Sequence, residues 1–240
     1  MIKLEKKESI YFLTMDAEEN RWNTTFVREI AKALDVIEKD EGPGALITAS
    51  TNQKFFSNGL DLEWMQAPEN HPEGGDREVF GEEFMYLMGR FITLPIPTVC
   101  AINGHSFGAG FMFALSHDVR IMREDRGFLC ANEMQLGLPI PRPELALFKH
   151  KIPANAFFET VQLSKRWTGS DALKAGIIQE VSSFEELPEV ALKKAEELAP
   201  LANNRKNFGH QKEMLYGENA AINLNHGPAH MLKNSRDFKV

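Results

Sequence analysis

The chain has 240 residues, of which 43% are hydrophobic and 25% are charged, the composition of one soluble globular domain with a sizeable core. Its formal net charge of −7 argues against nucleic acid or an anionic membrane as a partner, because either would need clustered Lys and Arg. No segment approaches the roughly 20 apolar residues that span a bilayer, and no signal peptide is recognisable. We therefore expect an intracellular, cytoplasmic protein.

The first part of the chain alternates between strand and helix patterns. Two short strands are predicted in KLEKK and IYFLTM, before residue 16. Asn23 and Thr24 can cap a helix, and apolar residues then recur at helical spacing until Gly42. The runs ALITAS and KFFSNGLDLEWM predict a strand, then a second strand, a turn and the start of a helix.

The pattern continues after a predicted loop at residues 67–77. A helix is expected from about residue 77 to residue 91, followed by strands in TVCAI, VRIMRE and FLCANE and a short helix at residues 111–115. Beyond Pro143 the chain is mostly helical. These alternations indicate an α/β fold. We expect a core at residues 1–195 and a helical C-terminal region at residues 196–240, both parts of one structural unit.

Two glycine-bearing turns each follow an apolar strand and open toward a helix. They are FSNGLD at residues 56–61 and NGHSFGAG at residues 103–110. Glycine lets a ligand approach the backbone, and the first N–H groups of a helix lack partners, so such turns can direct N–H donors at an oxyanion. The alternative is that both are simply tight connections. Neither turn has the spacing of a dinucleotide or nucleotide fingerprint.

In this order, the two turns resemble the crotonase, or enoyl-CoA hydratase/isomerase, family. The similarity extends from Asn23 through FFSNGLDL, AINGHSFGAGFMFALSHDVRI and NEMQLGLPI into WTGSDALKAGIIQEV. It implies a crotonase-like spiral of β-β-α turns and an acyl-CoA substrate. It also implies a homotrimer, or a dimer of trimers, formed through the helical region at residues 196–240.

The resemblance also implies the positions of the site residues. The backbone N–H groups of Ser57 and Ala109 would hold the thioester carbonyl oxygen. The chain through Asn58, Gly59 and Leu60 would continue from Ser57 along the coenzyme A moiety. Two further side chains could line an acyl pocket or simply pack in the core, namely Trp64 and Met112. Asp61 is expected to cap a helix.

The number of carboxylates distinguishes the reactions of this family. Family members that hydrate a double bond resemble one another in having two glutamates, and the corresponding positions here are Met112 and Glu133. A thioether cannot hold or deprotonate water. A single carboxylate suffices to move a proton along a substrate, so the sequence is most similar to the single-glutamate Δ3-Δ2-enoyl-CoA isomerases. Partial burial of Glu133 would raise its pKa toward that of a useful base.

The remaining candidates have structural alternatives. His105 and His117 are expected to be core or interface residues. Arg205, Lys206 and Lys212 could contact coenzyme A phosphates or form a solvated helix face. We find no cluster with metal-ligand spacing, and we expect no cofactor, because coenzyme A is part of the substrate. Two other functions remain open: another single-carboxylate acyl-CoA enzyme, such as a hydrolase or dehalogenase, and a non-catalytic acyl-CoA-binding protein.

Overall fold

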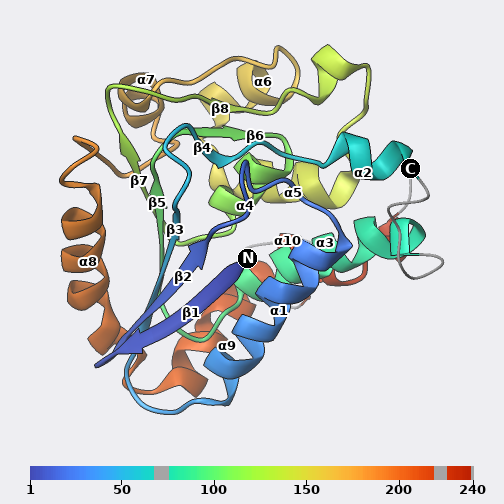
Figure 1. Cartoon of the computed structure of the whole chain (residues 1–240). Coiled ribbons are helices and arrows are strands. Elements are labelled where there is room, and N and C mark those ends of the chain that lie inside the picture. The colour runs from blue at the N-terminus through green and yellow to red at the C-terminus, as the bar shows by residue number, and fades with distance from the viewer. Residues whose placement is uncertain (68–75, 219–225, 239–240) are drawn as a thin grey trace.

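The structure is a computed structural model that describes residues 1–67, 76–218 and 226–238 (Figure 1). Its described strands form a six-stranded sheet, in the order β1-β2-β3-β5-β7-β9, and a three-stranded sheet, in the order β4-β6-β8. The larger sheet comprises β1 (Ile2–Lys7), β2 (Ile10–Met15), β3 (Ala45–Ser50), β5 (Thr98–Ile102), β7 (Val119–Arg123) and β9 (Glu180–Ser182). The smaller sheet comprises β4 (Phe55–Ser57), β6 (His105–Phe107) and β8 (Leu129–Cys130).

The chain winds through the two sheets as a spiral. After the antiparallel β1-β2 pair, each turn adds one parallel strand to the large sheet and one to the small sheet, and helical structure follows. The helices of these turns are α1 (Thr24–Lys39), α2 (Leu62–Gln66), α3 (Asp76–Ile92), α4 (Ala109–Leu115), the 3-10 helix η2 (Glu133–Leu136) and α5 (Arg142–Lys151). This arrangement confirms the predicted spiral of β-β-α turns.

The remaining helices follow the spiral or cover its large sheet. They are α6 (Ala154–Val161), α7 (Gly169–Lys174), α8 (Leu187–Leu198), η3 (Ala199–Ala202), α9 (Arg205–Tyr216), α10 (Pro228–Lys233) and η4 (Ser235–Phe238). Figure 1 shows α8 standing against one face of the large sheet, at the left of the view. Ile47 and Val99 pack there against Ala191 and Ala195, whose small side chains allow close approach. Alternate strand residues enter the larger core on the other face.

Local capping explains where two of the predicted helices begin. The side chain of Asn23 accepts a hydrogen bond of 2.9 Å from the Phe26 N–H, at the start of α1. Asp61 accepts one of 3.0 Å from the Trp64 N–H, at the start of α2. Each bond satisfies an N–H that lacks a partner within its helix, so both predicted caps are confirmed.

The C-terminal helices pack back onto the spiral. The Lys212 ammonium on α9 lies 2.7 Å from an Asp118 carboxylate oxygen, and Lys212 is only 4% exposed. Arg205, at the start of α9, donates to the Tyr11 hydroxyl at 2.9 Å. The solvated helix face predicted for Lys212 is therefore wrong, because its charge is buried against the core. The ion pair with Asp118 also engages the Lys212 ammonium that was a candidate contact for coenzyme A phosphates. Lys206, in contrast, is exposed.

Two predicted elements differ from the structure in extent. The FLCANE segment forms a strand only at Leu129–Cys130, because β8 pairs with the three-residue strand β6 and the chain then turns into η2. The predicted turn at residues 103–110 contains β6 itself. Most of the predicted loop at residues 67–77 lies outside the described residues. Across the described ranges, no helix is both long enough and apolar enough to cross a membrane.

Candidate active site

The two glycine turns meet in space, although about 50 residues separate them in the chain. Gly59 has a φ of +80°, and a Cβ atom placed on it would lie 2.8 Å from the Phe107 carbonyl oxygen and 3.9 Å from the Ala109 nitrogen. A Cβ atom on Gly110 would lie 2.7 Å from the Ser57 Oγ. The turns are therefore in van der Waals contact, and a side chain at either glycine would push them apart.

Parallel pairing explains why both turns lie at the same edge of the small sheet. Ser57 pairs with Ser106, so β4 and β6 end side by side. Gly108 then adopts φ 47° and ψ −117° as the N-cap of α4, a conformation that favours glycine. Ala109 is the first residue of α4, so its N–H group has no partner inside the helix. At this edge of the small sheet, the Ala109 N–H is thus a backbone donor at the start of a helix.

The Ser57 hydroxyl is engaged in structural hydrogen bonds. It accepts a bond of 3.0 Å from the Trp22 indole N–H and donates one of 2.7 Å to the Asn20 carbonyl oxygen. Asn58 is held by Glu19, since both the backbone N–H and the side-chain amide of Asn58 donate to it, at 2.9 Å and 2.7 Å. These contacts fix the backbone from Ser57 to Gly59 and account for the Ser57 hydroxyl without a nucleophilic role.

Glu133 lies beside the second turn, at the start of η2. A Cβ atom on Gly108 would be 3.2 Å from Glu133 Oε1 and 3.3 Å from Asn132 Oδ1. The other carboxylate oxygen, Oε2, is buried and accepts no hydrogen bond from the described residues. Burial raises the pKa of Glu133 above its usual value. The structure thus places a partly desolvated carboxylate next to the N-terminus of α4.

A second carboxyl group, which is not among the candidates predicted from the sequence, lies near this one. Glu144 is in the first turn of α5 and is partly buried. Burial, and secondly the negative charge of Glu133, raise the pKa of Glu144 to about 8. In sequence, an acidic residue after Pro141 and Pro143 indicates only a favourable interaction with a helix start, so there was no local signal of its proximity to Glu133.

The other predicted binding residues lie at different depths. Leu60 is partly buried and forms an isolated β-bridge with Trp22. Trp64 is buried and packs against Phe80, with ring centroids 5.8 Å apart. Met112 is 1% exposed and belongs to the main core. Of these three predicted residues, only Leu60 belongs to one of the two turns.

His117 is a core residue, one of the two positions predicted for it from the sequence. Its ring nitrogens lie 2.9 Å from the Phe113 carbonyl oxygen and 2.8 Å from the Thr48 hydroxyl. Burial lowers the pKa of His117 to about 3, so the ring is neutral. His105 stacks on Phe107 with ring centroids 5.2 Å apart, and burial lowers its pKa as well. Neither histidine needs a catalytic role to explain its position.

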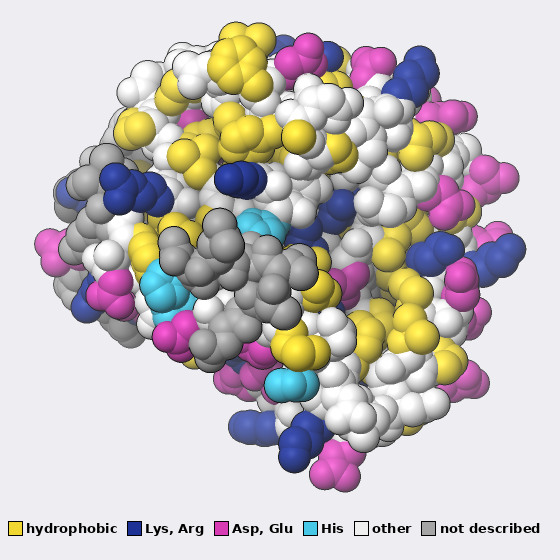
Figure 2. Space-filling view, turned by 180° about the vertical axis from the view of Figure 1, so that it is seen from behind, with side chains coloured by type: hydrophobic (Ala, Val, Ile, Leu, Met, Phe, Trp, Pro, Cys, Tyr) yellow, Lys and Arg dark blue, Asp and Glu magenta, His cyan; other side chains and the backbone are white. Residues whose placement is uncertain are grey.

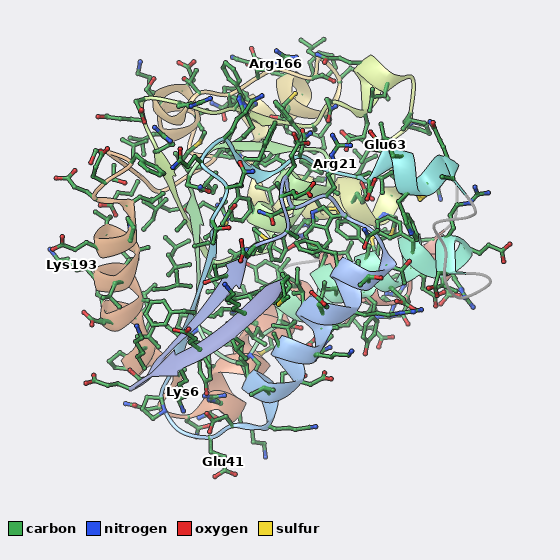
Figure 3. All side chains as sticks on the ribbon, viewed as in Figure 1. Lys6, Arg21, Glu41, Glu63, Arg166 and Lys193 are labelled. Carbon is green, nitrogen blue, oxygen red and sulfur yellow. The ribbon has the colours of Figure 1, made fainter. Side chains whose placement is uncertain are left out.

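A surface hollow adjoins the first turn. It has a volume of about 890 Å³, and the residues that line it include Arg21, Asp61 and Glu63. Figure 3 shows Arg21 and Glu63 beside each other near α2, and their side chains are 3.8 Å apart. Arg21 also contacts Glu19, which holds Asn58. The Arg21 guanidinium, paired with these two carboxylates, therefore lies next to the segment predicted to follow coenzyme A.

Curated proteins are similar in sequence to this chain over most of its length. An enoyl-CoA delta isomerase 3 from Arabidopsis thaliana is 32% identical over 222 residues, which cover 91% of this chain and 93% of that protein. A peroxisomal enoyl-CoA delta isomerase 2 from the same plant is 31% identical, with 92% and 95% covered. A carnitinyl-CoA dehydratase from Salmonella typhi is 32% identical over a shorter stretch, covering 66% of this chain and 59% of that protein.

Solved structures have the same architecture. An apo enoyl-CoA isomerase from Mycobacterium tuberculosis has a TM-score of 0.77 and 26% identity, with 88% of this chain and 89% of that chain covered. A second structure of that same Mycobacterium tuberculosis protein, described there as a probable enoyl-CoA hydratase, has a TM-score of 0.82 at 24% identity, covering 98% and 92%, which supports the shared fold. The enoyl-CoA hydratase/isomerase family model matches residues 5–226. The chain belongs to the enoyl-CoA hydratase/isomerase, or crotonase, family.

Proposed function

We propose that the protein moves the double bond of 3-enoyl-CoA thioesters from Δ3 to Δ2. In this mechanism Glu133 removes a proton from C2, and the C2–H electron pair delocalises into the thioester as an enolate. The N–H groups of Ser57 and Ala109 stabilise the enolate oxygen. The protonated Glu133 then returns the proton at C4, so the carboxylate is regenerated. Metal and redox cofactors have no part in this proposal.

One observation carries the proposal: the Glu133 carboxylate lies against the glycine turn that begins α4, and one of its oxygens is buried without a partner. An unpaired carboxylate oxygen is available to accept a proton. Its raised pKa makes it a stronger base than an exposed glutamate, which favours proton transfer near neutral pH. The curated relatives named as enoyl-CoA delta isomerases support the same reaction.

The substrate path and the assembly are parts of the same proposal. The backbone from Ser57 to Leu60 would run along coenzyme A, near Arg21, whose guanidinium is paired with Glu19. A homotrimer or a dimer of trimers would bury exposed apolar surface. Figure 2 shows hydrophobic side chains gathered over the upper part of the face opposite Figure 1. Among the exposed large apolar side chains, Leu201 lies in the predicted trimerisation region at residues 196–240, whereas Leu136, Leu138, Phe158 and Leu163 lie outside it.

A second candidate function is the addition or removal of water. Two carboxyl groups are needed to hold and activate water in that reaction, and Met112 cannot be one of them. Glu144 could supply the second group, because it lies close enough for the charge of Glu133 to raise its pKa. The carnitinyl-CoA dehydratase relative also points to this chemistry. Isomerisation remains our first choice, because it requires Glu133 alone.

The decisive experiment measures both reactions on the same preparation. A 3-enoyl-CoA substrate reports the formation of the conjugated thioester, and a 2-enoyl-CoA substrate reports the addition of water. We expect isomerisation with little or no hydration. Hydration at a comparable rate, abolished in Glu144→Gln, would establish the second candidate instead. Binding of both thioesters with turnover of neither would identify a non-catalytic acyl-CoA-binding protein.

A further inference from the structure

Three potential metal ligands converge in the C-terminal helical part of the described chain. Glu218 lies just after α9, His226 precedes the N-cap of α10, and His230 is within α10. One ligand atom from each residue lies within 4.8 Å of the other two. His230 Nδ1 lies 3.9 Å from Glu218 Oε2. These residues lie outside the proposed catalytic group of Ser57, Ala109 and Glu133.

Aromatic packing holds the two imidazole rings together. The rings of His226 and His230 are stacked, with centroids 4.5 Å apart and an interplanar angle of 17°. Phe238 meets both rings near its edge, at centroid distances of 5.4 Å and 5.9 Å. Rings that are already packed lose less conformational freedom when a ligand binds. Stacking alone would explain the histidine pair, but it does not account for the carboxylate beside it.

We propose that Glu218, His226 and His230 bind a divalent late first-row metal ion of the Zn²⁺ class. Imidazole nitrogen and carboxylate oxygen are ligands that Zn²⁺ accepts, with bonds of about 2.0–2.2 Å. In tetrahedral geometry such bonds separate the ligand atoms by about 3.3 Å. The three atoms, which lie within 4.8 Å of one another, therefore need to approach by up to about 1.5 Å, through rotation of the exposed Glu218 side chain and small shifts of the two rings. The fourth position would hold water.

The neighbouring cations are paired with other carboxylates, so they leave the Glu218 carboxylate available to a metal ion. Lys233, one turn after His230 on α10, is paired with Glu213 at 3.1 Å. Arg236 on η4 is paired with Glu82. Both cations nearest in sequence to His230 thus have carboxylate partners elsewhere in the described chain. A metal ion at the cluster would join the residue after α9 to the beginning of α10, and so would cross-link two helices of the C-terminal region.

The test titrates the full-length, tag-free protein with Zn²⁺ alone, using isothermal titration calorimetry. We expect one Zn²⁺ per chain. The double variant His226→Gln/His230→Gln should bind at least about tenfold more weakly. His210→Gln is the matched control, because His210 is an exposed histidine on α9 outside the cluster. It should bind like the wild type. Acyl-CoA turnover is not needed as a readout, so failure of the proposed function leaves this test intact.

Two outcomes overturn the site. The proposal is wrong if the wild type binds no Zn²⁺, or if the double variant and His210→Gln bind it as tightly as the wild type. Should the double variant fail to fold, Glu218→Gln decides the matter together with Co²⁺. Wild-type protein with Co²⁺ should show the intense visible absorption of a four-coordinate site, and Glu218→Gln should lose most of it. An unchanged spectrum in Glu218→Gln would remove the carboxylate from the site and overturn the proposal.

Discussion

The two glycine turns and the segment from Glu133 to Glu144 supply different kinds of chemistry. The turns present backbone groups, whose positions follow from parallel strand pairing and from glycine conformations at Gly59 and Gly108. The later segment presents two carboxyl side chains, whose pKa values depend on what packs around them. An N–H donor needs only a position, whereas a general base needs a position and an environment.

This difference separates two classes of substitution. A change at a turn acts on the direction of a donor or on the packing between turns. A change at Glu133 or Glu144 acts on ionisation and therefore depends on pH. Four substitutions test this division.

Glu133→Gln should lower isomerase turnover by a factor on the order of 10³ or more, because the amide cannot accept the C2 proton. The measurement is kcat with a 3-enoyl-CoA substrate, together with the affinity for acyl-CoA, which should be retained. In the wild type, kcat/KM should fall as the pH falls through the pKa of Glu133, which burial raises. A folded variant that keeps most of its activity would exclude Glu133 from the mechanism.

Ala109→Pro should cost about 2.7–4 kcal/mol of transition-state stabilisation, because it deletes one oxyanion donor. Proline is well tolerated at the first position of a helix, which is where Ala109 lies, so α4 should survive the change. The measurement is kcat, accepted only if circular dichroism and the thermal midpoint stay near wild type. Ala109→Gly retains the N–H and should remain active. Normal turnover by a folded proline variant would refute the oxyanion role.

Ser57→Ala should reduce stability by about 1–3 kcal/mol, because it leaves the buried Trp22 indole N–H and the Asn20 carbonyl oxygen without their partner. The backbone N–H is kept, so the folded variant should still catalyse isomerisation. Urea denaturation measures the first effect, and kcat per folded molecule measures the second. A fully stable but inactive variant would instead indicate that the hydroxyl takes part in the chemistry.

Glu144→Gln should change how stability depends on pH. The folded-state pKa of Glu144 is about 8, above its usual 4.5, so this group's contribution is fully present below pH 4.5 and is lost as the pH rises through 8. The variant, which has no carboxyl group at this position, does not lose stability in this way. Its thermal midpoint relative to wild type should therefore rise between pH 4.5 and 8 and change little above that. A difference that does not vary with pH would show that Glu144 ionises like an exposed residue.

Features that depend on neighbouring residues were predictable from the sequence. Asn23 and Asp61 are helix caps because each bonds an N–H three residues ahead. The glycine turns were recognisable because each joins an apolar strand to a helix. The family resemblance then identified Glu133 as the base of the proposed mechanism. That role remains a prediction, although the structure places Glu133 beside Gly108.

Features that depend on distant residues could not be predicted in the same way. Lys212 is buried because it meets Asp118, which lies 94 residues earlier in the chain, and nothing around Lys212 in sequence indicates that partner. Glu144 resembles an ordinary acidic residue at a helix start until the packing of α5 brings it near Glu133. Charge burial is a property of the assembled fold, so a local pattern gives too little information about it.

The strand order of the large sheet has a consequence for how the chain can assemble. Along β1-β2-β3-β5-β7-β9, every strand pairs with the strand of this sheet that precedes it in sequence. During synthesis, each new strand of the large sheet can therefore pair with a strand that has already been made, before any later segment is needed. Domains generally fold as units during synthesis, N-terminal parts first. In this sheet, the order of translation is also an order in which strands can be added without rearranging those already paired.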